Sequence, residues 1–177
     1  MYKKLFFFCL IIPIISMYAQ NDPLIQYQWN LNKIMAQNAW NITTGSPSII
    51  IAILDNGIDS NHPDLQNKLV IGYDVIDNDN TTDPYGNYWH GTACAGAAAA
   101  GTNNGIGIAS IGYNCKIMPI QIAHDDNINN PIKFVTGLNW AVAHGADIIC
   151  FSGHTDNSQD VLDAIDYAMI FPPKSIQ

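Results

Sequence analysis

Apolar residues along the chain gather in runs that predict strands alternating with helices. The clearest run is residues 49–54, IIIAIL, whose unbroken β-branched and aliphatic side chains are typical of a strand buried on both faces of a parallel sheet. Further strands are predicted at residues 69–75, 116–122 and 147–151, and helices at residues 36–42, 90–100, 131–144 and 161–169. Pro119, inside the 116–122 strand, predicts a bulge or a sheet edge, because proline cannot donate a hydrogen bond to a neighbouring strand.

This alternation indicates βαβ crossovers, and therefore an α/β domain with a doubly wound, mostly parallel sheet that carries helices on both faces. In such sheets the chemistry gathers at the carboxyl ends of the strands. Asp55 directly follows the strand at residues 49–54, and His90 begins the helix at residues 90–100. We therefore expect these two side chains to lie close together at one edge of the sheet.

The amino-terminal segment has the pattern of a secretory signal peptide. A start with two lysines is followed by an apolar run over residues 5–15 and by a short exit region of small residues. The run is interrupted by Pro13 and is shorter than the roughly 20 residues that span a bilayer. We expect residues 1–20 to be a signal peptide, cleaved after Ala19 or Gln20, and the mature protein to be secreted and extracellular, without a membrane anchor.

Composition narrows the classes of protein further. With 177 residues, of which 48% are hydrophobic and 12% charged, the chain is expected to form one globular domain. It has 7 basic residues, all lysine, against 15 acidic ones, all aspartate, so a nucleic-acid partner is not expected. The mature part holds three cysteines. This odd number argues against a disulfide framework, and none of them has a histidine and an acid beside it in the sequence, so a catalytic cysteine is not expected.

Two segments contain the candidate catalytic residues: ILDNGIDSNHPDL at residues 53–65 and HGTACAGAAAA at residues 90–100. An aspartate that accepts a hydrogen bond from one imidazole nitrogen fixes the tautomer, so the other nitrogen can take a proton from a serine hydroxyl. Together the segments resemble the Asp and His blocks of the subtilisin-like serine proteases. The resemblance implies a subtilisin-like fold, a protein or peptide substrate cleaved by acyl transfer, and catalytic roles for Asp55 and His90.

Three further segments extend the resemblance in the same order as in that family: NDPL at residues 21–24, TNNGIGIASIG at 102–112 and GADIICFSG at 145–153. The last resembles the strand that pairs with the peptide substrate, which implies substrate-binding roles for Ser152 and Gly153. The family usually has Ser or Thr at the position of Asn56. After Ser152 it commonly continues with Leu-Gly or Trp-Gly, where this chain has Gly153 and His154.

The resemblance also implies a structural calcium ion. In many members of the family the loop after the catalytic helix binds calcium together with the amino-terminal arm and the acid of the HPD segment. The matching positions are Asp22, Asp64, Gly101, Asn104, Ile106 and Ile108. The alternative is that Asp64 caps a turn and Asn104 supports a left-handed loop residue. The acidic loop with Asp74, Asp77, Asp79 and Asp83 is interpreted as a solvated loop rather than as a second ion site.

By resemblance, residues 21–169 correspond to the first half of a subtilisin-like peptidase domain, a truncated version of the fold, and residues 170–177 form a divergent tail. Neither the oxyanion asparagine nor the Gly-Thr-Ser block of the family follows. We therefore expect the chain to be inactive by itself. The alternatives are a non-catalytic pseudoprotease or peptide-binding module, and a gene fragment that does not fold.

Overall fold

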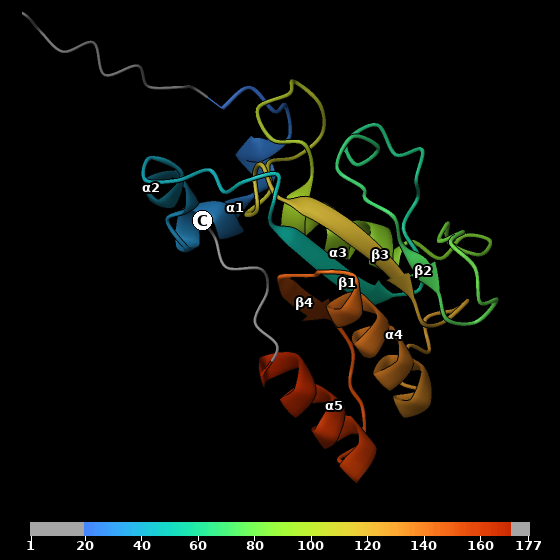
Figure 1. Ribbon diagram of the computed structural model, residues 1–177. Helices are drawn as coiled ribbons and strands as arrows, with labels where there is room; N and C mark the ends of the chain where they lie inside the picture. The colour runs from blue at the N-terminus through green and yellow to red at the C-terminus, as the bar shows by residue number, and fades with distance from the viewer. Residues whose placement is uncertain (1–19, 171–177) are drawn as a thin grey trace, which may run out of the picture.

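Residues 20–170 form a four-stranded parallel sheet with helices on both faces (Figure 1). The computed structural model describes residues 20–170, so the expected signal peptide, apart from its last residue, and residues 171–177 of the expected tail lie outside it. The strand order is β2-β3-β1-β4, and every neighbouring pair is parallel. The strands are β1 (Ile50–Asp55), β2 (Tyr73–Asp74), β3 (Lys116–Gln121) and β4 (Ile148–Phe151). The predicted parallel sheet is confirmed.

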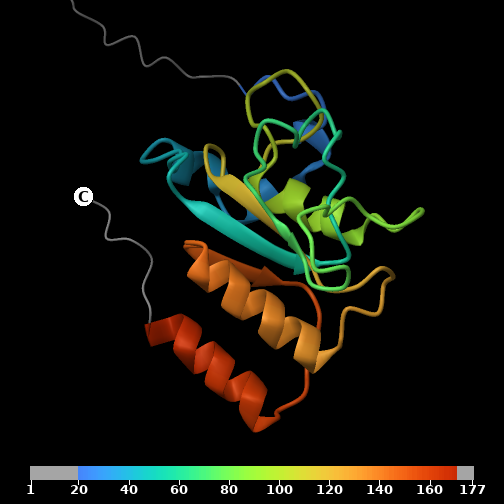
Figure 2. The same ribbon diagram turned by 45° about the vertical axis from the view of Figure 1, so that its right-hand side comes forward.

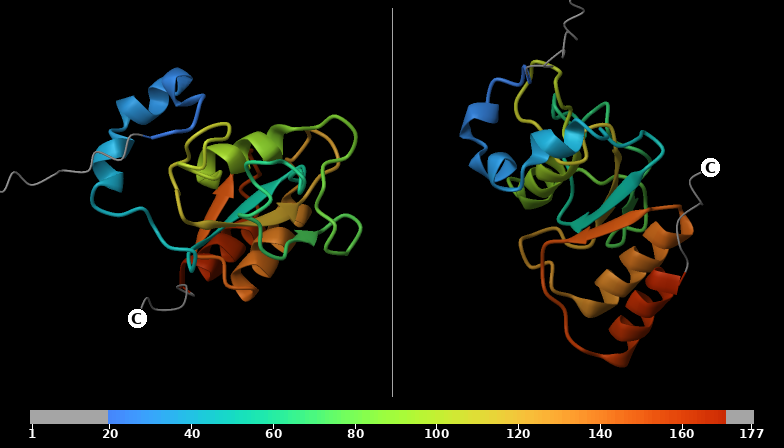
Figure 3. Two further views of the ribbon diagram at one scale, coloured as in Figure 1. Left: turned by 90° about the horizontal axis from the view of Figure 1, so that it is seen from above. Right: turned by 90° about the vertical axis from the view of Figure 1, so that its left-hand side faces the viewer.

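Three helices cover the two faces of this sheet. They are α3 (His90–Ala99), α4 (Pro131–Ala143) and α5 (Gln159–Ile170). Seen from above in Figure 3, α3 lies on one side of the sheet and the pair α4 and α5 on the other. Figure 2 shows α4 and α5 running side by side. The doubly wound arrangement expected from the sequence is therefore present.

Strand β1 is apolar throughout because it contributes to a core on each face. Ile51 and Ile53 pack on the side of α3, in one cluster with its buried alanines. Ala52 and Leu54 pack on the opposite side, against side chains of α4 and α5. Since successive residues of a strand point to opposite faces, a run without polar residues is what this central position requires.

The start and end of α4 follow its local sequence. The Asn130 side chain accepts hydrogen bonds from the backbone N–H groups of Ile132 and Lys133, at 3.0 and 3.1 Å, so it caps the helix. Pro131 occupies the first helical position, where no N–H is needed. Gly145 follows the helix with a φ of 84°, a left-handed conformation that glycine adopts without strain.

Strand β3 corrects the prediction drawn from Pro119. The strand lies between β2 and β1, so it is not an edge strand, and its register with β1 is continuous through Pro119, so there is no bulge. The contacts on the other side of β3 are interrupted at this point, between an isolated bridge at Ile117 and the short β2. The missing N–H therefore falls in a gap of the ladder. The same gap reduces the strand expected at residues 69–75 to two residues.

The amino-terminal arm lies over the loop that follows α3. It comprises a 3-10 turn, η1 (Ile25–Tyr27), and two short helices, α1 (Trp29–Lys33) and α2 (Ala36–Trp40). The backbone N–H of Leu24 donates to the Gly107 carbonyl at 3.0 Å, and a small apolar cluster joins the arm to Ala109. No helix within residues 20–170 is long and apolar enough to cross a membrane.

Candidate active site

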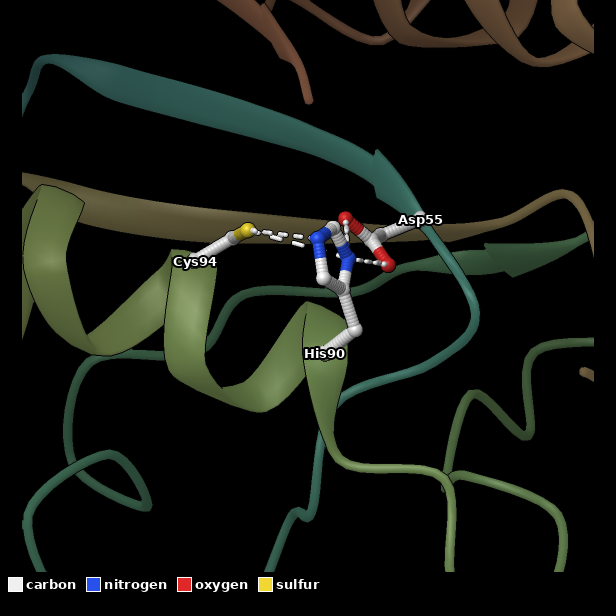
Figure 4. A group of neighbouring side chains, drawn as sticks. All are labelled: Asp55, His90 and Cys94. Atoms are coloured by element: carbon white, nitrogen blue, oxygen red, sulfur yellow. Dashed lines mark hydrogen bonds and ion pairs between the residues drawn. The ribbon is translucent and has the colours of Figure 1, made fainter. Parts of the chain in front are cut away.

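The structure brings Asp55 and His90 into direct contact at the carboxyl-terminal end of β1 (Figure 4). Asp55 is the last residue of β1 and is 1% exposed, and His90 is the first residue of α3. The two carboxylate oxygens of Asp55 lie 2.8 and 3.0 Å from Nδ1 of His90. The backbone N–H of Asn56 also donates to Oδ1 of Asp55, at 2.8 Å, so the carboxylate is held from two sides.

Local sequence explains why α3 can start so close to β1. The side-chain oxygen of Asn56 accepts a hydrogen bond from the backbone N–H of Gly91 at 2.9 Å, and its amide nitrogen donates to Asp126 at 3.0 Å. A Cβ on Gly91 would lie 2.4 Å from the Gly57 carbonyl oxygen and 2.9 Å from Cβ of Asp55. A glycine directly after His90 is therefore what allows the imidazole to reach the carboxylate.

This geometry suits general base chemistry at His90. A buried carboxylate at Nδ1 favours the tautomer in which Nδ1 carries the hydrogen and Nε2 is free to accept a proton. The His90 side chain is 44% exposed, so a reactant can approach the ring from solvent. The position of Nδ1 between two carboxylate oxygens also stabilises the imidazolium that forms when Nε2 is protonated.

Cys94 lies beside this pair, which the sequence-based analysis missed. Its sulfur is 3.9 Å from Nδ1 and 4.0 Å from Nε2 of His90. The sequence-based analysis saw no histidine and acid beside this cysteine along the chain, whereas the structure places both His90 and Asp55 near it. The signal was the spacing of four residues between His90 and Cys94, which places both on one face of a helix. Burial raises the pKa of the Cys94 thiol, against a lowering by its hydrogen bond to Ser152, so the thiol stays protonated at neutral pH and is a weak nucleophile.

Ser152 and Gly153 follow the end of β4, at the same edge of the sheet as Asp55. Strand β4 pairs with β1 in parallel, with Phe151 opposite Leu54. The Ser152 hydroxyl lies 4.0 Å from Sγ of Cys150, and Cys150 packs against the same apolar cluster as Cys94 of α3. At Gly153 a Cβ would lie 2.7 Å from the ring of Phe151, so a larger residue could not follow the same path.

The two aspartates of the expected calcium positions lie against the loop after α3. Both are buried, Asp22 at 2% and Asp64 at 3% exposure. The Asp22 carboxylate accepts hydrogen bonds from the backbone N–H groups of Asn103 and Asn104, at 2.7 and 3.0 Å. The Asp64 carboxylate accepts from the Asn104 side chain at 2.8 Å and from the backbone N–H of Ile108 at 3.1 Å.

The remaining calcium positions belong to the same loop. The backbone N–H of Gly101 donates to the Asp64 carbonyl at 2.8 Å, and the backbone N–H of Ile106 donates to the Asn104 side-chain oxygen at 2.8 Å. Among residues 20–170 no ion pair involves either buried aspartate. The two buried carboxylates are thus stabilised by neutral N–H donors.

Known proteins share this arrangement of elements. The family model described as "Subtilase family" matches residues 46–172. Thermitase from Thermoactinomyces vulgaris is 39% identical over 153 residues, which cover 85% of this chain and 54% of thermitase. A thermophilic serine proteinase from Bacillus sp. (strain AK1) is 36% identical, over 84% of this chain and 37% of its own length.

Solved structures of proteases have a similar fold. A protease from Pseudoalteromonas arctica PAMC 21717 has a TM-score of 0.75 and 28% identity, over 86% of this chain and 56% of that one. Fervidolysin from Fervidobacterium pennivorans has a TM-score of 0.73 and 31% identity, over 85% of this chain and 24% of that one. The chain thus spans about half, or less, of the length of these proteins. The family match includes β1 with Asp55 and α3 with His90, and this chain belongs to the subtilase family.

Proposed function

We propose that this chain supplies two residues of a serine endopeptidase site, Asp55 and His90. Asp55 orients His90, and His90 acts as the general base. The observation that supports this most directly is the placement of both Asp55 oxygens within 3.0 Å of Nδ1 of His90. Among the described residues no serine hydrogen-bonds to His90. The serine nucleophile is therefore proposed to lie outside residues 20–170.

In that role His90 moves the proton at two points of peptide-bond cleavage. Its Nε2 takes the proton from the serine hydroxyl as the oxygen attacks the carbonyl carbon, and then gives the proton to the leaving amine nitrogen. Asp55 stays ionised and holds the ring in the required orientation. Burial of Asp55 keeps water from competing for its oxygens.

A peptide substrate is supported by the free edge of β4. In the described sheet β4 pairs with β1 alone, so its other edge offers backbone N–H and C=O groups to an extended peptide. Such a peptide would run past Ser152 and Gly153 towards His90. These two residues are therefore proposed to contact the substrate through their backbone.

The test is a chimera that joins residues 20–170 to the part of thermitase that this chain does not match, assayed on a peptide substrate. We expect hydrolysis, and expect Asp55→Asn to lower kcat by about 10⁴-fold because the wrong tautomer of the imidazole is then favoured. His90→Ala should do at least as much. His144→Gln is the matched control, since the side chain of this exposed histidine bonds to the Trp140 carbonyl and stacks on its ring. Full activity in both site variants would refute the assigned roles.

Calcium is proposed at the loop after α3, held by Asp22, Asp64 and the side chain of Asn104 with carbonyl oxygens of Gly101, Ile106 and Ile108. Carboxylate, amide and carbonyl oxygens are the ligands that calcium takes, and the two buried aspartates have no ion-pair partner in the described part of the chain. The ion would join the amino-terminal arm to the end of α3.

Export is proposed from the pattern of residues 1–20. One relative is described as a halolysin-like extracellular serine protease, from Natrialba magadii, with 32% identity over 140 residues. Another is the major intracellular serine protease of Bacillus subtilis, with 33% identity over 122 residues, so family membership alone does not decide the compartment. The intact mass of secreted material should correspond to a start at Gln20 or Asn21, and retention of Met1 would contradict cleavage.

A further inference from the structure

Asp126, an exposed acid in the loop after β3, makes a contact that ties this loop to the junction between β1 and α3. Its Oδ1 accepts a hydrogen bond from Nδ2 of Asn56 at 3.0 Å. Asn56 directly follows Asp55 and is fully buried, with 0% exposure. The two residues are 70 positions apart in the chain, and the sequence-based analysis assigned no role to Asp126.

The side-chain amide of Asn56 bridges two groups that need opposite hydrogen-bond partners. Its Oδ1 accepts from the backbone N–H of Gly91 at 2.9 Å, while its Nδ2 donates to Asp126. Gly91 lies in the first turn of α3, and Trp89, directly before the helix, forms no side-chain cap. Backbone N–H groups of a first turn have no partner within the helix. Asn56 therefore caps α3 from a different segment of the chain.

The carboxylate of Asp126 decides which way this amide points. An ionised carboxylate only accepts hydrogen bonds, so it selects the Nδ2 end of the amide and leaves Oδ1 to face Gly91. In the reversed orientation Nδ2 would face the Gly91 N–H, and two donors would meet beside a side chain that is closed to water. A buried donor without an acceptor destabilises the folded state. The orientation of the amide thus controls whether α3 can begin next to the end of β1.

The loop that carries Asp126 is anchored on both sides of this residue. Ala123 and Ile128 are 7% and 5% exposed and belong to the core on the α4 side of the sheet. The Asp126 carboxylate is therefore presented from a fixed position, although the residue is exposed. The adjacent Asp125 is engaged within the loop itself, where its Oδ1 accepts from the backbone N–H of Asn127 at 2.9 Å.

We propose that Asp126 is a positioning residue for His90 and acts through Asn56. His90 directly precedes Gly91, and its Nδ1 lies 2.8 Å from the Asp55 carboxylate. A shift in the first turn of α3 therefore moves the imidazole relative to that carboxylate. This inference rests on the proposed role of His90 as the general base, and it adds the residue that keeps the base in place.

The test compares Asp126→Ala with two control variants by NMR of the isotope-labelled full chain. In Asp126→Ala the Gly91 N–H should exchange with solvent at least about tenfold faster, because a hydrogen bond to a charged group is lost. The downfield resonance of the His90 Nδ1–H should weaken in the same variant. Asp126→Asn keeps an oxygen that can accept from Asn56, and Asp125→Ala removes a neighbouring charge. Both controls should resemble the parent.

The thermitase chimera adds a kinetic measurement. Asp126→Ala should lower kcat and leave the KM for the peptide unchanged, because the proposed contacts of the substrate with β4 are kept. Unchanged Gly91 exchange in Asp126→Ala would overturn this inference alone. An equal effect of Asp125→Ala would also overturn it, since the cause would then be charge in general. A parent without the His90 resonance would instead refute the proposed function, and this inference with it.

Discussion

Replacing Gly91 by alanine should disrupt the junction between β1 and α3. The added Cβ would lie 2.4 Å from the Gly57 carbonyl oxygen, a backbone atom, whereas ordinary van der Waals contact begins at 3.4 Å. Neither partner can move alone, because the backbone N–H of Gly91 is also bonded to the Asn56 side chain. The start of α3 must therefore shift away from the end of β1 by about 1 Å.

The size of the effect follows from two opposing terms. Forcing an extra carbon into a packed site costs about 1 to 3 kcal/mol, and glycine to alanine inside a helix returns at most about 1 kcal/mol. Gly96 in the same helix is the matched control, because a Cβ there would meet only Ile108, at 3.6 Å. Gly96→Ala should be neutral or stabilising. The helix gain is common to both variants, so they should differ by the packing cost alone, about 1 to 3 kcal/mol.

Urea unfolding followed by circular dichroism measures this difference in the free energy of unfolding. In the thermitase chimera Gly91→Ala should also lower kcat, since the shift moves His90 from a carboxylate only 2.8 Å away, while Gly96→Ala should retain activity. Equal stability of the two variants would refute the close contact between Gly91 and Gly57.

Three other predictions concern the chain by itself. If calcium binds the folded state, Ca²⁺ at 100 times its Kd should stabilise the protein by about 2.7 kcal/mol relative to a sample with chelator. The difference in melting temperature between these two samples should vanish in Asp64→Asn. It should persist in the control Asp156→Asn, which changes an exposed acid. Burial lowers the pKa of Lys68 from its ordinary value of 10.5, so between the lowered pKa and 10.5 the unfolded chain binds more protons and stability rises with pH. Lys68→Met should remove that rise in urea unfolding curves taken over this range, and an unchanged slope would contradict the burial of the charge. A fluorophosphonate probe should not label any serine of the chain, because a base without a positioned nucleophile has nothing to activate; stoichiometric labelling that is lost in His90→Ala would show this expectation to be wrong.

Local patterns were sufficient to predict the elements and the type of sheet. An unbroken apolar run over residues 49–54 has no exposed face, which only a central strand covered on both sides can accommodate. The proline and glycine that flank α4 fixed its ends, because their backbone preferences act within a few residues. The position of Asp55 at a strand end likewise followed from the chain itself.

Strand order was not accessible from local patterns, and the error at Pro119 came from this. Whether a missing N–H matters depends on which strand lies opposite at that residue. The gap beside Pro119 is made by residues 69–73, which reach β3 only after the chain has folded. If the missing N–H of a proline had faced a paired residue of the neighbouring strand, this strand could not have occupied an inner position in the sheet.

The pair of Asp55 and His90 shows the same division between sequence and structure. Motif spacing predicted that Asp55 and His90 meet, and the spacing of His90 and Cys94 already placed both on one helical face. That Cys94 also shares an apolar cluster with Cys150 of β4 depends on the pairing of β4 with β1. The sequence motifs were therefore sufficient to predict the contact between Asp55 and His90. Which residues of β4 lie beside this pair depends on how the strands are ordered in the sheet.

For this protein, the sequence by itself determined the parallel α/β architecture, the family and the meeting of Asp55 with His90, because each depends on patterns within a short stretch of chain. Only the tertiary structure brought His124 against Asp74 and Asp77, 50 and 47 positions earlier in the chain. The register between β2 and β3 places these side chains together. Contacts of this kind are fixed by how strands align in the folded sheet, and no local preference of the chain encodes that alignment.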